Sequence, residues 1–255
     1  MLIQEFMRLG LYKGMTLIVH SSLRSLGWVS GGPVTVVQAL MEVITEEGTL
    51  VMPTHSGENS DPSHWQCPSV PEDWWDTIRE TMPAFHPTYS PTRGMGKVPD
   101  VFRTFPEVIR SYHPSVSFAA WGKDARFITD GHSLDFGLGE QSPLARLYDL
   151  DSSVLLLGVD YDSNTSFHLA ENRLPNRIVK AESAPVIEAG ERVWATYSEI
   201  EYQTELFVDM GIAFEKSYPV TIHQVAASAC KLFKQRDCVD FGLDWLMNRA
   251  ASDTL

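Results

Sequence analysis

The sequence predicts a single α/β domain built on a mixed, largely parallel central sheet that is flanked by helices. The first sixty residues run strand, polar loop, helix, strand, which is typical of a parallel α/β unit. Later apolar runs of strand length alternate with segments of helical periodicity. No internal repeat, low-complexity tract or break in composition marks a linker. Residues 1–255 are therefore expected to form one domain rather than two small ones.

The first half of the chain begins with a helix and two buried strands. Apolar residues at helical spacing predict the helix at residues 2–11, and apolar, partly β-branched runs predict strands at 16–20 and 48–53. Between these strands, Pro33 suits the first turn of a helix that extends to residue 44.

The second half continues the alternation of helices and strands. Its clearest buried strand is SSVLLLGV at residues 152–159. A two-residue alternation predicts another strand at 191–202, which can pair with 179–187 in a hairpin. A short strand is predicted at 118–122, and helices are predicted at 96–105, 142–150, 163–174, 223–237 and 241–251.

Residues 55–95 differ in character and are expected to form a long loop excursion. Prolines forbid a continuous helix or a central strand there. Loops of this length in a compact chain are usually functional or disordered, and the interleaved aromatic residues favour an ordered loop that covers something. The residues concerned are Pro62, Pro68, Pro71, Pro83, Pro87, Pro91, Trp65, Trp74, Trp75 and Phe85.

Composition and charge exclude several classes of protein. With 44% hydrophobic and 21% charged residues, the chain is typical of a soluble globular protein. A formal net charge of −13 argues against nucleic acid as a partner; it suits a polycationic partner, or serves solubility. No signal peptide or apolar run of ~18 residues is present, so a cytoplasmic protein without a membrane partner is expected. Three cysteines without metal spacing predict reduced thiols.

The strongest constellation of polar residues is GVDYDSNTSFHLAENR. A buried strand ends at Asp160 and Asp162, and the following helix presents His168 and Glu171 on one face. Active sites of open α/β sheets lie beyond the carboxyl ends of strands. A histidine beside a carboxylate suits general base chemistry, although a helix-face histidine without a role is the simpler alternative.

Two further segments could bind an anion. The serine- and glycine-rich stretch after the first strand can hold phosphates on backbone N–H groups, although as a motif it is weak and a structural turn is the simpler interpretation. Arg93 and Lys97 form a basic island at the start of a helix, although both could be solvated surface cations.

Two other chemistries find no support in the sequence. The remaining histidines show no metal spacing such as H-E-x-x-H, so no metal is assigned. Without a G-x-S-x-G elbow, no serine is singled out as the nucleophile of a hydrolase.

Seven segments, in this order, resemble the aminoglycoside 3-N-acetyltransferase family of antibiotic acetyltransferases. They cover roughly residues 10–215 and are VHSSLRSLG, GTLVMPTHS, PTRGMGKVPDVFR, HPSVSFAAWGKDA, GEQSPLARL, LLLGVDYDSNTSFHLAE and RVWATYSEIEY. The resemblance implies an α/β fold distinct from the GNAT acetyltransferases. It also implies acetyl-coenzyme A (acetyl-CoA) as donor and direct transfer from the thioester to an amine.

The resemblance also implies roles for individual residues. His168 would be the general base, and its acidic partner is open between Glu171, Glu199 and Glu201, with a preference for Glu201. The donor would contact Ser21, Ser22, Leu23, Arg24, Ser25, Gly27, Arg93, Gly94, Met95 and Gly96. The acceptor would contact Asp160, Asp162, Asn164 and Glu171.

The expected acceptor is an aminoglycoside, modified at its 3-N position, or a similar polyamine. The tryptophan-rich loop from Glu58 to Phe85 would lie over the acceptor side. Two alternatives stay open: an enzyme that acts on another amine, and a non-catalytic module that binds CoA. A monomer and a homodimer are equally compatible with the sequence.

Overall fold

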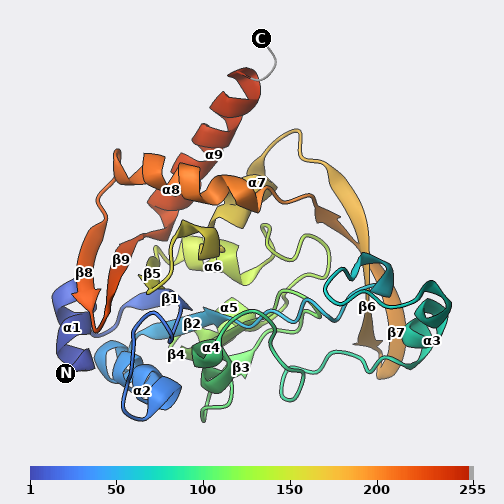
Figure 1. Cartoon of the computed structure of the whole chain (residues 1–255), viewed down its shortest axis with the longest axis horizontal. Helices are drawn as coiled ribbons and strands as arrows, with labels where there is room; N and C mark the ends of the chain where they lie inside the picture. The colour runs from blue at the N-terminus through green and yellow to red at the C-terminus, as the bar shows by residue number, and fades with distance from the viewer. Residues whose placement is uncertain (253–255) are drawn as a thin grey trace.

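A seven-stranded mixed sheet forms the centre of the computed structural model, which describes residues 1–252 (Figure 1). The strand order is β3-β4-β2-β1-β5-β9-β8. Only β1 is parallel to both of its neighbours, and the other pairings are antiparallel. The strands are β1 Thr16–Ser21, β2 Thr49–Pro53, β3 Ile109–Arg110, β4 Phe118–Gly122, β5 Ser153–Leu157, β8 Thr221–Val225 and β9 Ser228–Lys234.

The directions of these strands show how far the sheet is parallel. Because β4 and β9 run opposite to the other five strands, the sheet is mixed, as predicted. Most strands share one direction, but parallel pairing is limited to β2, β1 and β5 at the centre. The central strands are buried on both faces, which explains their continuous apolar runs.

Helices cover both faces of the sheet. Leu17 and Val19 of β1 face one core, and Ile18 faces the other, as the alternation of a strand requires. The first core is completed by α1 Leu2–Leu9, α2 Gly32–Ile44 and α4 Lys97–Phe102. The second is completed by α5 Ala125–Thr129, α6 Pro143–Asp149, α7 Phe167–Arg173, α8 Phe207–Glu215 and α9 Gln235–Ser252.

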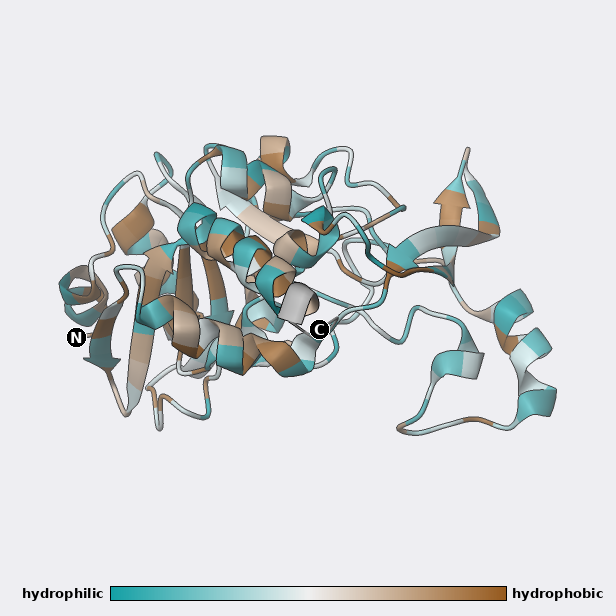
Figure 2. Cartoon of the chain, turned by 90° about the horizontal axis from the view of Figure 1, so that it is seen from above, coloured by the Kyte–Doolittle hydropathy of each residue, from teal (hydrophilic) through white to brown (hydrophobic). Residues whose placement is uncertain are grey.

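A β-hairpin stands apart from the central sheet. Strands β6 Val179–Glu188 and β7 Glu191–Ile200 pair along their whole length and form a sheet of their own. Ala189 and Gly190 connect them with positive φ angles, as a tight two-residue turn requires. The structure thus confirms the predicted hairpin. In Figure 2 the hairpin projects from the body of the protein together with part of the loop excursion.

The loop excursion is ordered and packs against the hairpin. It contains the 3-10 turns η1 Pro62–His64 and η2 Glu72–Trp74 and the helix α3 Trp75–Thr81. The backbone N–H of Phe85 donates to the carbonyl of Pro185 in β6 (3.0 Å), and Arg192 of β7 donates to the carbonyl of Met82 (2.8 Å). The excursion and the hairpin therefore form one projecting unit.

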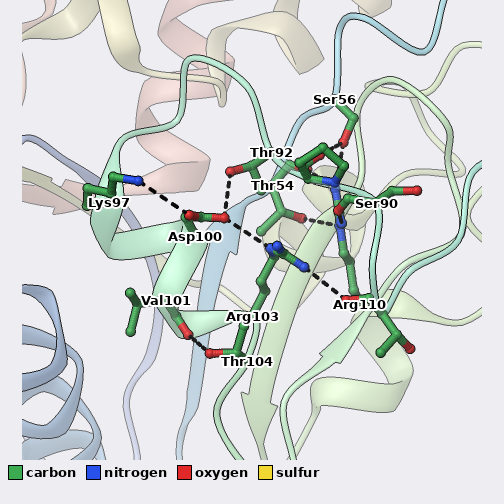
Figure 3. A network of polar contacts seen from close by, with 12 residues as sticks. Thr54, Ser56, Ser90, Thr92, Lys97, Asp100, Val101, Arg103, Thr104 and Arg110 are labelled. Carbon is green, nitrogen blue, oxygen red and sulfur yellow. Dashed lines mark hydrogen bonds and ion pairs between the residues drawn. The ribbon is translucent and has the colours of Figure 1, made fainter.

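Arg110 ties the base of the excursion to the central sheet (Figure 3). Its guanidinium donates to the carbonyl of Thr54 (2.5 Å), the hydroxyl of Ser56 (2.8 Å) and the carbonyl of Ser90 (2.5 Å). Burial lowers the pKa of Arg110 to about 10, so the group stays charged at neutral pH. One side chain thus holds both ends of the excursion at the edge of the sheet.

The predicted helix at residues 223–237 is wrong. Residues 221–234 form the β8–β9 hairpin, with Ala226 at φ 52° in the turn, and only from Gln235 does the chain become helical. Backbone pairing decides this segment, because β9 pairs with β5 from Ser153↔Lys234 to Leu156↔Lys231. The 3-10 turns η3 Tyr161–Ser163 and η4 Thr204–Leu206 complete the described elements.

The structure also bears on the expectations about membranes and thiols. Among residues 1–252, no helix combines the length and the hydropathy that crossing a bilayer requires. All three cysteines are free thiols: Cys67 is exposed, whereas Cys230 and Cys238 are buried.

Candidate active site

His168 and Glu171 form an acid–base pair on α7, in which Glu171 is buried and His168 is partly buried. The Nδ1 atom of His168 lies 2.7 Å from Oε2 of Glu171, and the other carboxylate oxygen accepts the backbone N–H of Gln203 (2.5 Å). Since a carboxylate only accepts, the proton of the neutral imidazole lies on Nδ1. Nε2 is then left with its lone pair, ready to accept a proton.

The other two carboxylates considered as partners of His168 lie elsewhere. Glu201 is exposed just beyond β7, where its backbone N–H donates to the carbonyl of Ile178 (3.0 Å). The preference for Glu201 is therefore wrong. Glu199 is buried and accepts the hydroxyl of Tyr202 (2.7 Å) and the backbone N–H of Gly137 (3.2 Å). Burial raises the pKa of Glu199.

Two aromatic rings fix the orientation of the imidazole. Tyr202 meets the His168 ring edge to face at 4.3 Å between centroids, and Phe207 lies at 4.9 Å. Asn172 also donates to the carbonyl of His168 (3.0 Å). The imidazole therefore has little rotational freedom, which suits a group that must present one nitrogen to a substrate.

A cavity of about 630 Å³, here called the serine-loop cavity, reaches His168 from one side. The loop after β1 and the loop before α4 line it. An ideal Cβ on Gly96 would lie 3.5 Å from the carbonyl oxygen of Ser21, so the two loops approach closely. Of the predicted donor contacts, Ser21, Ser22, Leu23, Arg24, Gly94, Met95 and Gly96 line this cavity.

Two predicted donor contacts, Ser25 and Gly27, do not line the serine-loop cavity. Ser25 is absent from its lining and bonds to the hydroxyl of Ser22 through both its backbone N–H (3.3 Å) and its own hydroxyl (2.9 Å). Gly27 takes a positive φ of 77° in the turn that follows and also lies outside the lining. Both residues shape the loop rather than face the cavity.

Arg93 points away from the serine-loop cavity. Its backbone N–H donates to the carbonyl of His55 (2.8 Å), and its guanidinium donates to the carbonyl of Cys67 (3.0 Å) and reaches Glu58 at 3.4 Å. Arg93, a predicted donor contact, therefore does not line this cavity. Lys97, its partner in the predicted basic island, does line the cavity.

A second cavity of about 920 Å³ lies between the excursion and the hairpin and is here called the hairpin cavity. Its lining includes Glu58 and Arg93 from the excursion side and Glu182 from β6. Glu199 and Tyr202 line it as well. Because Tyr202 contacts His168, which lines the serine-loop cavity, this pair of rings stands where the two cavities approach each other.

The predicted acceptor residues are scattered. Asp160 lines neither cavity, because it caps η3 and pairs with Lys231 at 2.7 Å. Asp162 and Asn164 line the serine-loop cavity, so they lie on the side predicted for the donor. Glu171 is buried and fully engaged with His168 and Gln203.

Two further histidines line the serine-loop cavity, the buried His20 and the partly buried His55, and no motif in the sequence singled them out. Burial lowers the pKa of both His20 and His55 to about 3, and nearby His168 adds to the effect, so both imidazoles are neutral. Nδ1 of His20 lies 3.5 Å from the hydroxyl of Thr165. The position of His20 at the end of a buried strand was the one available signal.

The donor set of the serine-loop cavity fits coenzyme A. Arg24 and Lys97 offer two cations for phosphates, and the glycines at 94 and 96 remove side chains that would crowd a ligand. Among the described residues, no group of three or more His, Cys, Asp or Glu side chains could hold a metal ion.

Comparison with known proteins identifies the family of this chain. The model of the aminoglycoside 3-N-acetyltransferase family matches residues 18–247. The SPbeta prophage-derived aminoglycoside N(3′)-acetyltransferase-like protein YokD of Bacillus subtilis is 53% identical over 96% of this chain and 90% of its own. Its crystal structure superimposes with a TM-score of 0.97 at 52% identity, covering 98% of this chain and 93% of that chain.

More distant relatives include proteins named as aminoglycoside acetyltransferases. Aminoglycoside N(3)-acetyltransferase VIII of Streptomyces fradiae is 34% identical over 97% of this chain and 91% of its own. The structure of AAC-IIIb in binary complex with CoASH matches with a TM-score of 0.87 at 28% identity, covering 97% of this chain and 95% of that chain. The chain therefore belongs to the aminoglycoside 3-N-acetyltransferase family and is an acyltransferase.

Proposed function

We propose that this enzyme transfers an acetyl group from acetyl-CoA directly to an amino group, with His168 as the general base. The observation that carries the proposal is the His168–Glu171 pair (2.7 Å), which lies where a cavity suited to the donor approaches a second cavity. Direct transfer needs both substrates beside one base, and this arrangement supplies such a place.

The donor is assigned to the serine-loop cavity. Arg24 and Lys97 would bind phosphates there, while the loop after β1 would follow the pantetheine chain. The CoA complex of the related AAC-IIIb supports CoA as the ligand. The thioester would then end near His168, which lines the same cavity.

The chemistry explains why a base is needed. An amine attacks a thioester carbonyl only with a free lone pair, so an acceptor ammonium must first lose a proton. Nε2 of His168 accepts it, and Glu171 stabilises the imidazolium through Nδ1. The new C–N bond forms as the C–S bond breaks, and a second proton passes from the amine nitrogen to the departing sulfur, so that CoA leaves as the thiol. A positioned base contributes about 10²–10⁴-fold to such a step.

The hairpin cavity is assigned to the acceptor. The names of the relatives suggest an aminoglycoside or a similar polyamine as the acceptor, and the carboxylates of Glu58, Glu182 and Glu199 in the lining are available to its ammonium groups. A second candidate, another amine, is favoured by the two cations in the same lining, Arg93 and Lys180.

A thiol-release assay tests the proposal. Acetyl-CoA is supplied with aminoglycosides, linear polyamines and simple amines, and free CoA thiol is measured against His168→Asn. Acceptor-dependent release by the parent protein, lost in the variant, supports the transfer. CoA binding without release with any amine would favour the non-catalytic module instead.

A further inference from the structure

The charges that line the hairpin cavity are a poor match for a polycation. Three carboxylates face two cations, Arg93 and Lys180, which leaves a formal excess of one negative charge. Burial also lowers the pKa of His113, another lining residue, to about 4, so that ring contributes no charge at neutral pH. An acceptor with several ammonium groups would leave most of them without a counter-charge.

Most of the acidic character of the cavity is already neutralised. Glu182 pairs with Lys180 (2.7 Å) and also contacts Nδ1 of His64 (3.1 Å). Glu58 faces Arg93 at 3.4 Å. Glu199 alone among these carboxylates has no basic side chain as a described contact; its partners are the Tyr202 hydroxyl and backbone N–H groups. Glu199 is also linked to the catalytic base, because the hydroxyl that it accepts belongs to Tyr202, whose ring packs on His168.

Arg93 is poised to bind an anion in this cavity. A guanidinium has five N–H donors, and the described contacts of Arg93 use only two of its nitrogens. The 3.4 Å contact with Glu58 is long for a charge-assisted bond, and the Arg93 side chain is 57% exposed. The bond to the carbonyl of Cys67 (3.0 Å) meanwhile holds the guanidinium in place.

We infer that the acceptor carries an anionic group in addition to its amine, and that Arg93 binds this group. The inference rests on the proposed transfer to an amine in the hairpin cavity and narrows its acceptor to a class. The anion is a carboxylate or a phosphate, since both accept paired hydrogen bonds from a guanidinium. The amine lies toward Glu199 and His168, and the acid lies toward Arg93.

Matched pairs of acceptors test this inference. Each pair consists of an acid-bearing amine and its neutral counterpart: β-alanine with β-alaninamide, 4-aminobutanoate with 4-aminobutanamide, and phosphoethanolamine with ethanolamine. Thiol release gives kcat/KM for each compound, with an aminoglycoside and spermidine as polycationic references. The carboxylate and phosphate pairs separate the two anions.

Three variants accompany the parent enzyme. Arg93→Gln removes the charge and Arg93→Lys retains it without the planar fork. Lys123→Gln removes an exposed cation that lines neither cavity. We expect the parent to prefer at least one acid-bearing amine over its neutral partner by about tenfold or more, which is the effect of one good charge-assisted contact. Arg93→Gln should reduce that ratio to within threefold, and Lys123→Gln should leave it unchanged.

The remaining outcomes separate this inference from the proposed function. Faster turnover of aminoglycosides or spermidine than of every acid-bearing amine would overturn the anionic acceptor and leave the transfer intact. An unchanged ratio in Arg93→Gln would overturn the role of Arg93. Absence of thiol release with every compound, in protein that still binds CoA, would refute the transfer itself and the inference with it.

Discussion

The carboxylate of Glu171 accepts two hydrogen bonds, one from Nδ1 of His168 and one from the backbone N–H of Gln203. Glu171→Gln can offer an oxygen to only one of these donors. If the oxygen stays with Gln203, the amide NH₂ faces Nδ1 and moves the imidazole proton to Nε2, the wrong tautomer for a base. We expect kcat to fall by about 10²–10⁴-fold. The matched control is Glu201→Gln, which should stay within about threefold of the parent in steady-state kinetics.

Replacement of the base itself should separate chemistry from binding. His168→Asn should lower turnover by about 10²–10⁴-fold, or about 3–5 kcal/mol of barrier, with little change in donor affinity. The parent rate should rise with pH, because only the neutral ring accepts a proton. Turnover within threefold of the parent, measured on folded variant protein, would refute the assignment of His168 as base.

Coenzyme A should stabilise the folded protein through the serine-loop cavity. At about 100 times the dissociation constant, a ligand adds about 2.7 kcal/mol to the free energy of unfolding. Lys97→Ala and Arg24→Ala should reduce the resulting shift in melting temperature, because both cations line this cavity. Arg93→Ala should leave the shift unchanged. An equal loss in all three variants would place Arg93 in the donor site after all.

Buried neutral histidines should make the protein sensitive to acid. The folded-state pKa is about 3 for His20 and His55 and about 4 for His113, against an ordinary 6.5. Below pH 6.5 the unfolded chain therefore binds more protons, and stability falls as the pH drops toward 3. Melting temperatures measured from pH 8 to pH 4 should show this loss. His113→Gln should flatten it, and His64→Gln, with an exposed side chain, should not.

Removal of Arg110 should loosen the excursion. Arg110→Met leaves the carbonyls of Thr54 and Ser90 without their charged donor, at a cost of about 1–3 kcal/mol in the free energy of unfolding. Limited proteolysis should then cut within residues 57–85 sooner than in the parent. Unchanged proteolysis together with unchanged stability would show that the network has no anchoring role.

Most of the fold could be predicted because it depends on local patterns. Strand β5 and helix α6 follow from an apolar run and from Ser142, whose hydroxyl caps the helix at Leu144. The segment at 223–237 could not, since alanines around residue 226 favour a helix while the pairing of Leu232 with Leu155 makes a strand. That pairing joins residues far apart in the chain.

The site was predictable to a similar degree and for the same reason. His168 and Glu171 share one helix face, so their contact follows from a three-residue spacing. The direction of Arg93 depends instead on the bond of its backbone to His55 and on the carbonyl of Cys67, neither of which leaves a signal in the sequence. Glu201 was favoured for its strand, yet the backbone beyond β7 turns its side chain to solvent.

The separation of the hairpin from the central sheet affects how such enzymes can diverge. Within residues 1–252, no strand of the central sheet pairs with β6 or β7. The hairpin can therefore be replaced without breaking the hydrogen-bond ladder that supports the loops after β1 and before α4. A two-stranded ribbon is marginal alone, and here the excursion supports it. We expect residues 57–85 and 179–200 to be exchangeable between relatives as one unit. The resulting chimaera would adopt a new acceptor and keep its old affinity for the donor.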